Sequence, residues 1–183
     1  YTAGGLLKAE TRPDGSISRY QYNQDGQLVQ LQHADGRLEQ YLWNDEGQLL
    51  ARKQGDALSR FSYDKLGRLN GMVDAAALVS EYQRNDAGKI ISVRQYPEQQ
   101  PELAITEQFS YDAAGRLQCS ALRMNPSVYG SLPSSACVLS TTGSMGPDRI
   151  TRTVYDPNLR VSNVTSAYGL AAASTENLAY TAN

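Results

Sequence analysis

The sequence predicts an all-β protein built of tandem antiparallel β-hairpins that join into one continuous curved sheet. Three observations carry this prediction. A short motif with turn chemistry recurs about every 21 residues, apolar and polar residues alternate before each copy, and Tyr (12) far outnumbers Phe (2) and Trp (1). Tyr suits half-buried sheet surfaces, because its ring packs against neighbours while its hydroxyl reaches water.

The motif consists of an aromatic residue, Asp or Asn, two variable residues, Gly, a polar residue and an aliphatic residue. Its aromatic position falls at residues 1, 22, 43, 63 and 84, which are 21, 21, 20 and 21 residues apart, and then at 111, 155 and 180. A fixed period is the signature of a repeat architecture. The motif residues to which we assign structural roles are Tyr22, Asp25, Gly26, Leu28, Trp43, Gly47, Leu49, Tyr63, Asp64, Gly67, Leu69, Gly88, Ile90, Tyr111, Asp112, Gly115, Leu117, Tyr155 and Asp156.

Each motif encodes a hairpin turn. Asp or Asn at the first position of the turn and Gly at the fourth are typical of a type I turn followed by a Gly bulge. The carboxylate of Asp64 can accept a hydrogen bond from the backbone N–H two residues on, and Gly67 supplies a positive φ. In one copy Leu159 stands at the Gly position. Because a positive φ is unfavourable for Leu, we expect Asn158 to take the left-handed conformation there.

The residues between motifs complete the hairpins. In Tyr20-Gln21-Tyr22 and its equivalents a period of two places both rings on one face of a strand. Stacked repeats are then expected to align Tyr with Tyr between neighbouring hairpins. Asp14-Gly15 and Asp35-Gly36 predict a second, two-residue turn in each repeat, with weaker versions at Gly55-Asp56 and around Asp74.

The chain divides into three segments. Residues 1–117 hold the regular repeats, residues 118–150 form a Pro-, Gly- and Ser-rich insertion, and residues 151–183 hold degenerate repeats of an array that we expect to be truncated at both ends. Both cysteines, Cys119 and Cys137, lie in the insertion. They either form a disulfide that closes it, which would fit an oxidising compartment, or are two unrelated small residues.

Tyr63-Asp64-x-x-Gly67-Arg68-Leu69 and Tyr111-Asp112-x-x-Gly115-Arg116-Leu117 resemble the YD (Rhs) repeat. That family includes bacterial Rhs and wall-associated proteins, the shell-forming subunits of insecticidal toxin complexes, and teneurins. The resemblance implies part of a hollow β-shell that, in bacterial members, encloses a C-terminal toxin. It also implies secretion or the bacterial cell surface as the location, and as partners the other repeats of the same parent chain and an encapsulated toxin. The insertion resembles inserts of bacterial Rhs proteins.

Residues suited to catalysis or metal binding are sparse. The single histidine, His33, is expected to point to solvent, and no G-x-S-x-G sequence is present. Two cysteines without clustered histidines cannot supply an ordinary closed zinc site. The acidic turn Asn44-Asp45-Glu46-Gly47 lacks calcium-loop spacing. We therefore expect no catalytic residue, no metal and no cofactor.

The net charge and the lengths of the apolar runs exclude some classes of partner. A formal net charge of −2 gives no electrostatic footprint for nucleic acid, and no apolar run is long enough to cross a bilayer. The resemblance to the YD repeat makes a structural wall segment that encapsulates or presents a toxin or effector the favoured function. The alternative is a carbohydrate-binding or cell-adhesion module that uses exposed aromatic residues, and an enzyme is the least supported class. Unpaired strand edges also predict self-association of the chain.

Overall fold

The computed structural model describes residues 1–181, which form strands and turns with two short 3-10 helices, Pro101–Leu103 and Pro126–Val128. The strands are β1 (Ala9–Thr11), β2 (Ile17–Tyr22), β3 (Leu28–Gln32), β4 (Leu38–Trp43), β5 (Leu49–Gln54), β6 (Ala57–Tyr63), β7 (Leu69–Val73), β8 (Leu78–Arg84), β9 (Ile90–Pro97), β10 (Ile105–Tyr111), β11 (Leu117–Arg123), β12 (Arg149–Tyr155), β13 (Val161–Ser166) and β14 (Ser174–Asn177). Of the motif copy that begins at Tyr180, Ala182 and Asn183 lie outside the described residues.

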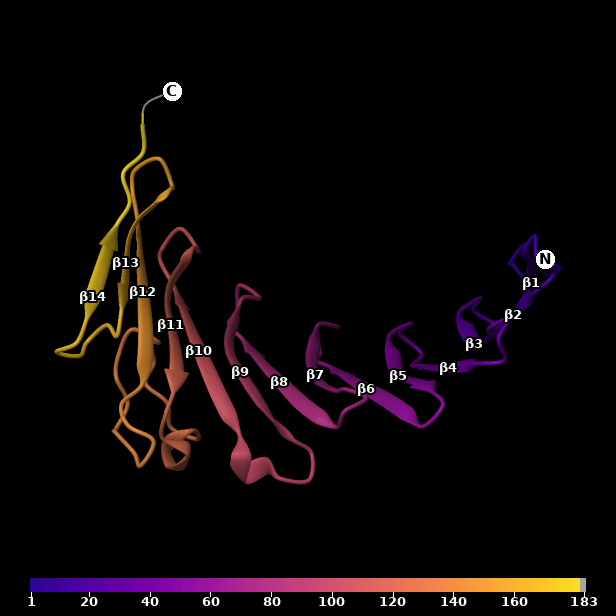
Figure 1. The fold of residues 1–183 in the computed structure, drawn as a ribbon, viewed down its shortest axis with the longest axis horizontal. Coiled ribbons are helices and arrows are strands. Elements are labelled where there is room, and N and C mark those ends of the chain that lie inside the picture. Colours follow the sequence, from indigo (N-terminus) through magenta and orange to yellow (C-terminus); the bar gives the residue numbers. More distant parts are fainter. Residues whose placement is uncertain (182–183) are drawn as a thin grey trace. The chain divides into compact units, whose positions relative to one another are not determined.

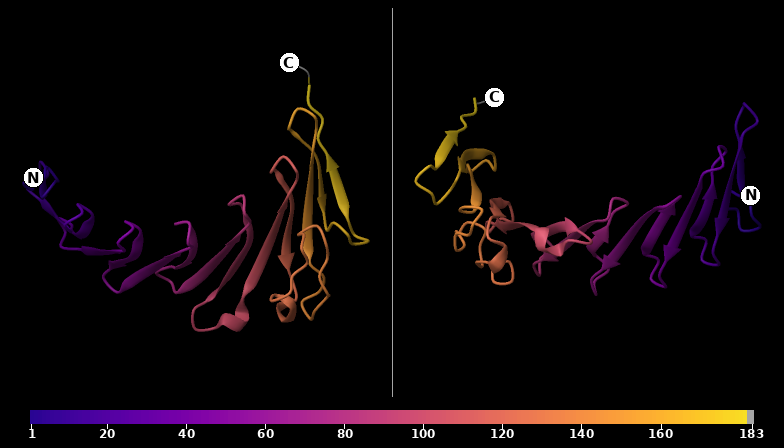
Figure 2. Two further views of the ribbon diagram at one scale, coloured as in Figure 1. Left: turned by 180° about the vertical axis from the view of Figure 1, so that it is seen from behind. Right: turned by 60° about the horizontal axis from the view of Figure 1, so that its bottom comes forward.

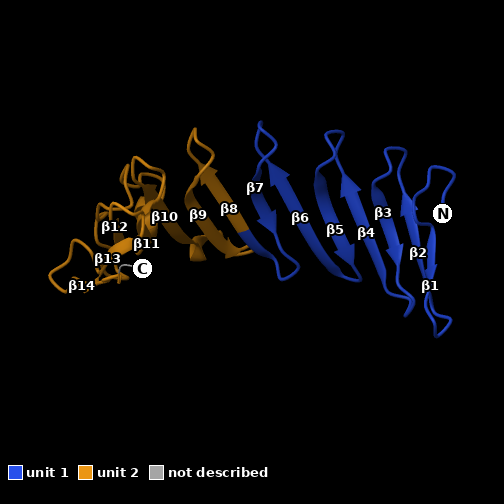
Figure 3. Cartoon of the chain, turned by 90° about the horizontal axis from the view of Figure 1, so that it is seen from above, with its two compact units in different colours: residues 1–79 blue, residues 80–183 orange. Residues whose placement is uncertain are grey.

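The strands follow one another in the sheet in the order in which they occur along the chain, β1 to β14. Every strand pair whose register is resolved is antiparallel, as in β2 with β3 and β10 with β11. Figures 1 and 2 show the hairpins of each part of the chain side by side in this order. The predicted all-β array of antiparallel hairpins is confirmed. Two compact units, Tyr1–Val79 and Ser80–Asn183, are coloured separately in Figure 3.

The motif turn at Asp64 shows why the motif has its form. The Gly67 N–H donates to the Asp64 carbonyl at 2.9 Å, and the Asp64 N–H donates to the Arg68 carbonyl at 2.8 Å. The Asp64 carboxylate accepts from the Leu66 and Arg68 N–H groups at 2.9 and 3.0 Å, and Gly67 has φ +76°. Gly67 and Arg68 thus both lie opposite Asp64, which is the predicted Gly bulge, and the pairing register shifts again between Ser62 and Tyr63, where it passes over Asn70.

In the motif copy that begins at Tyr22, the acceptor of the turn hydrogen bonds is Asn in place of Asp. Asn23 Oδ1 accepts from the N–H groups of Asp25 and Gln27 at 3.1 and 2.9 Å, whereas Asp25 is an exposed third residue of the turn. Asn therefore replaces Asp without loss of the turn, because the two side chains offer the same acceptor oxygen.

The second turn of the early repeats differs from the two-residue loop predicted from Asp-Gly. At Pro13-Asp14-Gly15 the loop has three residues, because Gly15 N–H donates to Arg12 O and Arg12 N–H donates to Ser16 O, both at 2.9 Å. The loop at residues 34–36 has the same pattern, closed by His33 and Arg37. Only Gly55-Asp56 is a two-residue loop, between the paired residues Gln54 and Ala57. Both ends of these hairpins therefore use one turn geometry in most repeats.

The prediction for Asn158 was wrong. Leu159 itself has φ +67°, and its N–H donates to the Asp156 carbonyl at 3.0 Å. The Arg160 N–H and guanidinium both bind the Asp156 carboxylate, at 2.9 Å each, and this pairing fixes the turn in the shape of the other copies. The turn therefore keeps its type and places Leu159 in a conformation that favours glycine.

Alternation along the strands gives the sheet two different faces. The aromatic face carries the rings that lie at and two residues before each motif aromatic position, such as Phe61 and Tyr63. The polar face carries the positions one, three and five residues before it, such as Ser62, Arg60 and Leu58. In β2, β4 and β6 the polar-face side chains are exposed except at Ile17, whereas those of the aromatic face are buried or half-buried except at Ala57.

The expected alignment of Tyr with Tyr between neighbouring hairpins was wrong, because Leu31 lies opposite Glu39 where β3 meets β4, and Arg52 lies opposite Ser59 where β5 meets β6. The cross-strand partner of each motif aromatic is the aliphatic residue of the same motif, Leu28 for Tyr22, Leu49 for Trp43 and Leu69 for Tyr63. The bulge causes this pairing, because it brings the two ends of the motif opposite each other across the turn.

Most of the predicted insertion is irregular, but its two ends belong to the sheet. Strand β11 continues to Arg123 and β12 begins at Arg149, and the two pair directly, with Ala121 opposite Ile150. The irregular part therefore runs from residue 124 to residue 148. It replaces the second turn of its repeat, so the repeat register continues on either side of it.

We predict that Leu159→Gly stabilises the chain by about 1 kcal/mol, because glycine adopts a positive φ without the steric penalty that Leu bears. The midpoint of urea unfolding measures this change. Leu66→Gly is the matched control, since Leu66 is also an exposed turn leucine but is not among the residues with positive φ. An equal or smaller gain for Leu159→Gly than for the control would contradict the prediction.

Candidate functional site

The repeats are joined by a ladder of side chain-to-backbone hydrogen bonds on the aromatic face. Tyr63 Oη donates to the carbonyl of Leu49, the aliphatic residue of the preceding motif, at 3.0 Å. The same bond recurs from Tyr22 to Leu7, Trp43 to Leu28, Tyr111 to Ile90, Tyr155 to Leu117 and Tyr180 to Val161, at 2.7 to 3.0 Å. The indole N–H of Trp43 replaces a hydroxyl, so the motif position selects a ring that carries a donor.

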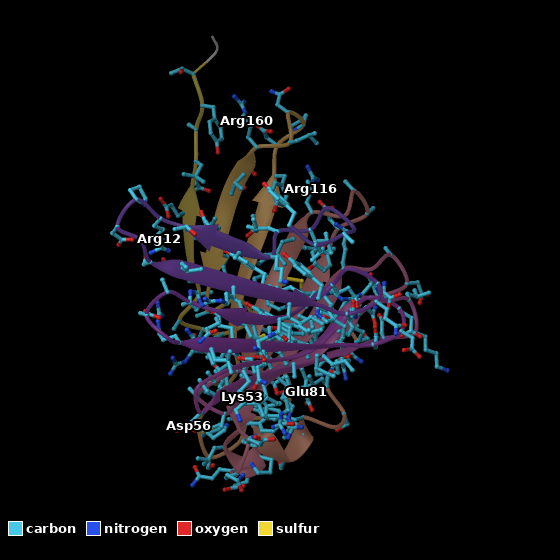
Figure 4. The ribbon with its side chains drawn as sticks, turned by 90° about the vertical axis from the view of Figure 1, so that its right-hand side faces the viewer. Arg12, Lys53, Asp56, Glu81, Arg116 and Arg160 are labelled. Carbon is cyan, nitrogen blue, oxygen red and sulfur yellow. A yellow bond between two sulfur atoms is a disulfide. The ribbon has the colours of Figure 1, made fainter. Side chains whose placement is uncertain are left out.

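The polar residue after the motif Gly forms a second link to the next repeat. Gln48 Nε2 donates to the Gly67 carbonyl at 3.2 Å, and Lys89 Nζ donates to the Gly115 carbonyl at 2.6 Å. In two motifs this residue is an Arg whose guanidinium lies over the next motif ring, Arg116 over Tyr155 at 4.4 Å and Arg160 over Tyr180 at 4.3 Å. Both arginines are labelled in Figure 4. A cation over the face of a ring is attractive, so these motifs contribute a contact at their start and at their end.

A buried carboxylate, Glu39, lies on the aromatic face of unit 1. Its two oxygens accept hydrogen bonds from Tyr41 Oη at 2.6 Å, from His33 Nε2 at 2.8 Å and from Arg52 Nη2 at 2.8 Å. The hydrogen bonds from Tyr41, His33 and Arg52 lower the pKa of Glu39 from 4.5 to about 2. The expectation that His33 points to solvent was wrong, because its ring is a partner of this carboxylate and is half-buried.

The irregular insertion is organised by a buried ion pair. Arg123 Nη1 lies 2.6 Å from Asp148 Oδ2, and both side chains are almost fully buried. The same guanidinium donates to the carbonyls of Val138 and Ser135 at 2.8 and 3.1 Å and to the Gln108 side-chain oxygen.

Asp148 receives backbone donors as well. The N–H groups of Met124 and Ser140 reach its carboxylate at 3.0 and 2.7 Å. Although burial acts in the opposite direction, these hydrogen bonds and the one from Arg123 lower the pKa of Asp148. The charged groups of Arg123 and Asp148 therefore both have hydrogen-bond partners, as a buried ion pair requires.

The insertion covers the polar face of β10, β11 and β12. Gln108 Nε2 donates to the Pro133 carbonyl at 2.7 Å, and the Ala136 N–H donates to Ser110 Oγ at 2.7 Å. Gln108 and Ser110 stand three and one residues before the motif aromatic Tyr111, which defines the face. The small hydrophobic core lies beneath this cover and consists of Cys119, Ala121, Ala136 and Ile150.

The two cysteines are bonded in the structure, with their Cα atoms 5.3 Å apart. The bond joins β11 to the covering segment and is drawn in yellow in Figure 4. A loop of 18 residues closed in this way stabilises the fold by about 3 kcal/mol in the loop-entropy picture. The disulfide and the Arg123–Asp148 pair thus hold the same segment from two sides.

Shallow recesses lie along the sheet. Three of them occupy equivalent positions, each between the motif turn of one repeat and the motif of the next. Their linings include Asn44 and Lys65 in one recess, Asn85 and Ala113 in another, and Gly4 and Gln24 in the third. The fourth, of about 660 Å³, lies on the polar face of unit 2 between the two 3-10 helices and is lined by Glu81, Arg94 and Tyr129 among others. In the fourth recess Glu81 already binds Tyr96 Oη at 2.8 Å and Arg94 at 3.4 Å.

Two kinds of feature, a metal-binding cluster and a membrane-spanning helix, were sought within residues 1–181. No group of three or more His, Cys, Asp and Glu side chains in this range is placed to hold a metal ion. No helix in it is long and apolar enough to cross a membrane.

The structure places the predicted motif residues at the turns and in the ladder, and it shows what sequence reasoning missed. Glu39, Arg123 and Asp148 received no role from the sequence. Glu39 carried a usable signal, because a carboxylate interrupts the aromatic face at a position where the neighbouring repeats have Ser18 and Ser59. The partnership of Arg123 with Asp148 spans 25 residues of irregular chain and left no periodic signal.

Comparison with known proteins supports the resemblance. Residues 1–38 match the family described as RHS Repeat. No curated protein matches this chain. Among solved structures, the chain is similar to the Tc holotoxin pore of Photorhabdus luminescens, with a TM-score of 0.64 and 18% sequence identity over 97% of this chain. It is also similar to the crystal structure described as TcdB2-TccC3-TEV, with a TM-score of 0.62 and 17% identity over 96% of this chain.

At these identities the likeness establishes the fold. The chain spans 9% of the length of each of these two proteins, so it corresponds in extent to a small part of either. The fold they share with this chain is the same tandem array of hairpins.

We predict that Tyr63→Phe lowers the free energy of unfolding by about 1 kcal/mol, because the Leu49 carbonyl loses its donor while the ring is kept. Urea unfolding measures the change, and Tyr1→Phe is the control because the Tyr1 ring is 84% exposed. A loss at Tyr63 no larger than at Tyr1 would show that the ladder bond does not stabilise the array.

We predict that Asp148→Ala lowers the free energy of unfolding by about 3–5 kcal/mol, because it leaves the Arg123 guanidinium buried without its carboxylate. Denaturant unfolding and amide exchange in residues 133–140 measure the effect. Asp56→Ala, at an exposed turn, is the control. The ion pair has no such role if both variants unfold at the same denaturant concentration.

We predict that Glu39 makes stability depend on acid pH. Its folded pKa of about 2 lies below its ordinary value of 4.5, so its contribution is present above 4.5 and is lost as the pH falls through about 2. As the pH falls between these two values, the free energy of unfolding should therefore decrease more steeply in the parent chain than in Glu39→Gln. Glu46→Gln, at an exposed turn, should retain the steep dependence. Identical profiles for the parent chain and Glu39→Gln would refute the assignment.

Proposed function

We propose that this chain, an Rhs/YD-repeat chain by its motif, its match over residues 1–38 and its fold, is a structural wall segment of a secreted or surface bacterial protein. In this role it encloses or presents a toxin or effector domain of the same parent protein. The observation that carries the proposal is the ladder from each motif aromatic to the carbonyl of the preceding motif. A bond that recurs from one repeat to the one before it lets a sheet grow to any length, as a wall requires.

The wall function is mechanical. Backbone hydrogen bonds join each strand to the next, and the ladder adds a second connection between successive hairpins that does not depend on the strands. Closing a sheet on itself removes exposed strand edges, which are otherwise sites of unwanted pairing. A chain of this kind therefore acts by what it surrounds, and we assign it no catalytic residue, metal or cofactor.

The alternative of a glycan-binding or adhesion module requires rings that are open to a sugar. On the aromatic face the candidates are occupied, because Trp43 Nε1 donates to the Leu28 carbonyl at 2.8 Å and Tyr41 Oη donates to Glu39 at 2.6 Å. Both rings are half-buried. This geometry favours packing between repeats as the use of the aromatic residues.

Electron microscopy of the full-length parent protein tests the proposal. We expect a closed shell with an internal cavity and a polypeptide inside it that resists added protease until the shell is opened by denaturant. The same polypeptide expressed without the repeats is the control and should be digested at once. Separate globules joined by flexible chain, with no cavity, would overturn the proposal.

A further inference from the structure

The two sulfurs of the disulfide differ in their access to solvent. Cys119 stands on the polar face of β11 and is 1% exposed, whereas Cys137 is half-buried in the irregular segment that covers this face. A thiol that approaches from solvent therefore meets the sulfur of Cys137 first. In thiol–disulfide exchange a thiolate attacks one sulfur and the other sulfur leaves, so this burial makes Cys119 the leaving group.

A cation lies beside the leaving sulfur. Arg152 of β12 is paired in register with Cys119, and directly opposed residues of an antiparallel pair have their Cβ atoms about 4.5–5.5 Å apart on one face. Arg152 Nη1 donates to Tyr168 Oη at 2.7 Å, and the guanidinium lies 4.9 Å from the centre of the Tyr168 ring. Both of these contacts are to a neutral side chain. Within residues 1–181 no carboxylate pairs with Arg152, so its charge is free to stabilise an anion.

The other arginine of this region serves a different purpose. Arg123 binds the covering segment and is neutralised by Asp148 at 2.6 Å. By contrast, Tyr168, the partner of Arg152, packs with Cys137 against the small hydrophobic core that contains Cys119. The Arg152–Tyr168 pair therefore lies next to the disulfide while its charge is not compensated by an acidic side chain.

The covering segment has few hydrogen bonds of its own. Within residues 133–140 one backbone-to-backbone hydrogen bond is present, from the Val138 N–H to the Ser135 carbonyl at 3.2 Å. The segment is otherwise held by side chains of the sheet, such as those of Gln108 and Ser110. A segment of this kind opens locally at low free energy, and the disulfide opposes this opening because it closes a loop of 18 residues.

We propose that the Cys119–Cys137 bond is a thiol–disulfide exchange site for a small dithiol, in which Arg152 stabilises the departing thiolate. The thiolate of the dithiol forms a bond to Cys137 Sγ, the S–S bond breaks, and Cys119 leaves with the electron pair and takes a proton. The second thiol of the dithiol then attacks the dithiol sulfur of the mixed disulfide and releases Cys137. The dithiol is thereby oxidised by two electrons and both cysteines become thiols.

The consequence of exchange is local. Once the bond is open, the covering segment separates from the sheet and uncovers the polar face of β10 to β12. Both sulfurs, Arg152 and the covering segment belong to unit 2, so the inference does not rest on the wall function.

Reduction of the 183-residue chain by dithiothreitol, followed by alkylation and intact-mass measurement, tests the exchange step. We expect Arg152→Gln to slow reduction at least about threefold, because a unit charge about 5 Å away no longer stabilises the thiolate. Arg152→Lys keeps the charge and should stay within about twofold of the parent chain. Arg149→Gln is the matched control, since Arg149 is an exposed residue of the same strand on the opposite face. Equal rates for Arg152→Gln and Arg149→Gln, or a folded chain that dithiothreitol does not reduce, would overturn the proposal.

The dependence on salt gives the same test without a substitution. Added salt should slow reduction of the parent chain, because it screens the attraction between Arg152 and the anion. A formal net charge of −2 repels an incoming thiolate, so the charge of the chain as a whole predicts the opposite sign. This measurement decides the role of Arg152 if circular dichroism shows that Arg152→Gln does not fold. A reduction rate that rises with salt or ignores it would overturn that role.

Amide exchange tests the opening of the covering segment. After reduction, amides of residues 134–140 should exchange about 100-fold faster, which is the loop-closure contribution of the bond expressed as an equilibrium constant. Amides of β2 to β6 should keep their protection. Cys119→Ser with Cys137→Ser lacks the bond and should exchange fast with and without dithiothreitol. Unchanged exchange of residues 134–140 on reduction, or loss of protection throughout the chain, would show that the bond does not control this segment.

Discussion

The rest of the structure depends on one contact, the hydrogen bond from each motif aromatic to the carbonyl of the motif aliphatic residue one repeat earlier. A polar group that lacks a hydrogen-bond partner costs free energy when it is shielded from water. Tyr63 and Tyr111 donate to a backbone carbonyl of the preceding motif and bury part of a ring in the same step. A single aromatic side chain therefore links neighbouring repeats both by a hydrogen bond and by packing.

This arrangement explains how a single layer of strands is stable with so little conventional core. The fully buried hydrophobic residues of the described chain are few and small, and four of the five, Cys119, Ala121, Ala136 and Ile150, lie together under the insertion. Elsewhere the apolar contacts are half-buried and run along one face. In a repeat array each unit is stabilised by its neighbours, so the free energy of folding is spread over many equivalent interfaces.

Within residues 1–181, the insertion is the one place where the sheet acquires a second layer. An irregular segment exposes backbone donors and acceptors that a strand would pair, and these must be satisfied when it covers a sheet. Arg123, Asp148 and Gln108 do this, since their side chains bind the segment at several backbone groups. The covering segment lies on the polar face, which leaves the aromatic ladder undisturbed.

The sequence by itself determined the repeat, the motif turns and the alternation of the strands. Each of these depends on residues within one motif, as at Asp64 and Gly67, where turn chemistry acts over four residues. The resemblance of the motif to the YD repeat, carried by the same residues, pointed to the fold that the comparisons support.

Only the tertiary structure decided which partners meet across repeats. The ladder joins residues about 14 to 38 positions apart, and neither the donor role of Tyr nor the acceptor role of the Leu carbonyl can be read from a periodic pattern. Two residues depart from what their local sequence predicts. His33 binds Glu39 although it was expected to face solvent, and Leu159 has a positive φ that is unfavourable for Leu. In both cases hydrogen bonds, to Glu39 and to Asp156, outweigh the preference of the residue alone. Local chemistry sets where the chain turns, whereas long-range hydrogen bonds decide what each turn brings together.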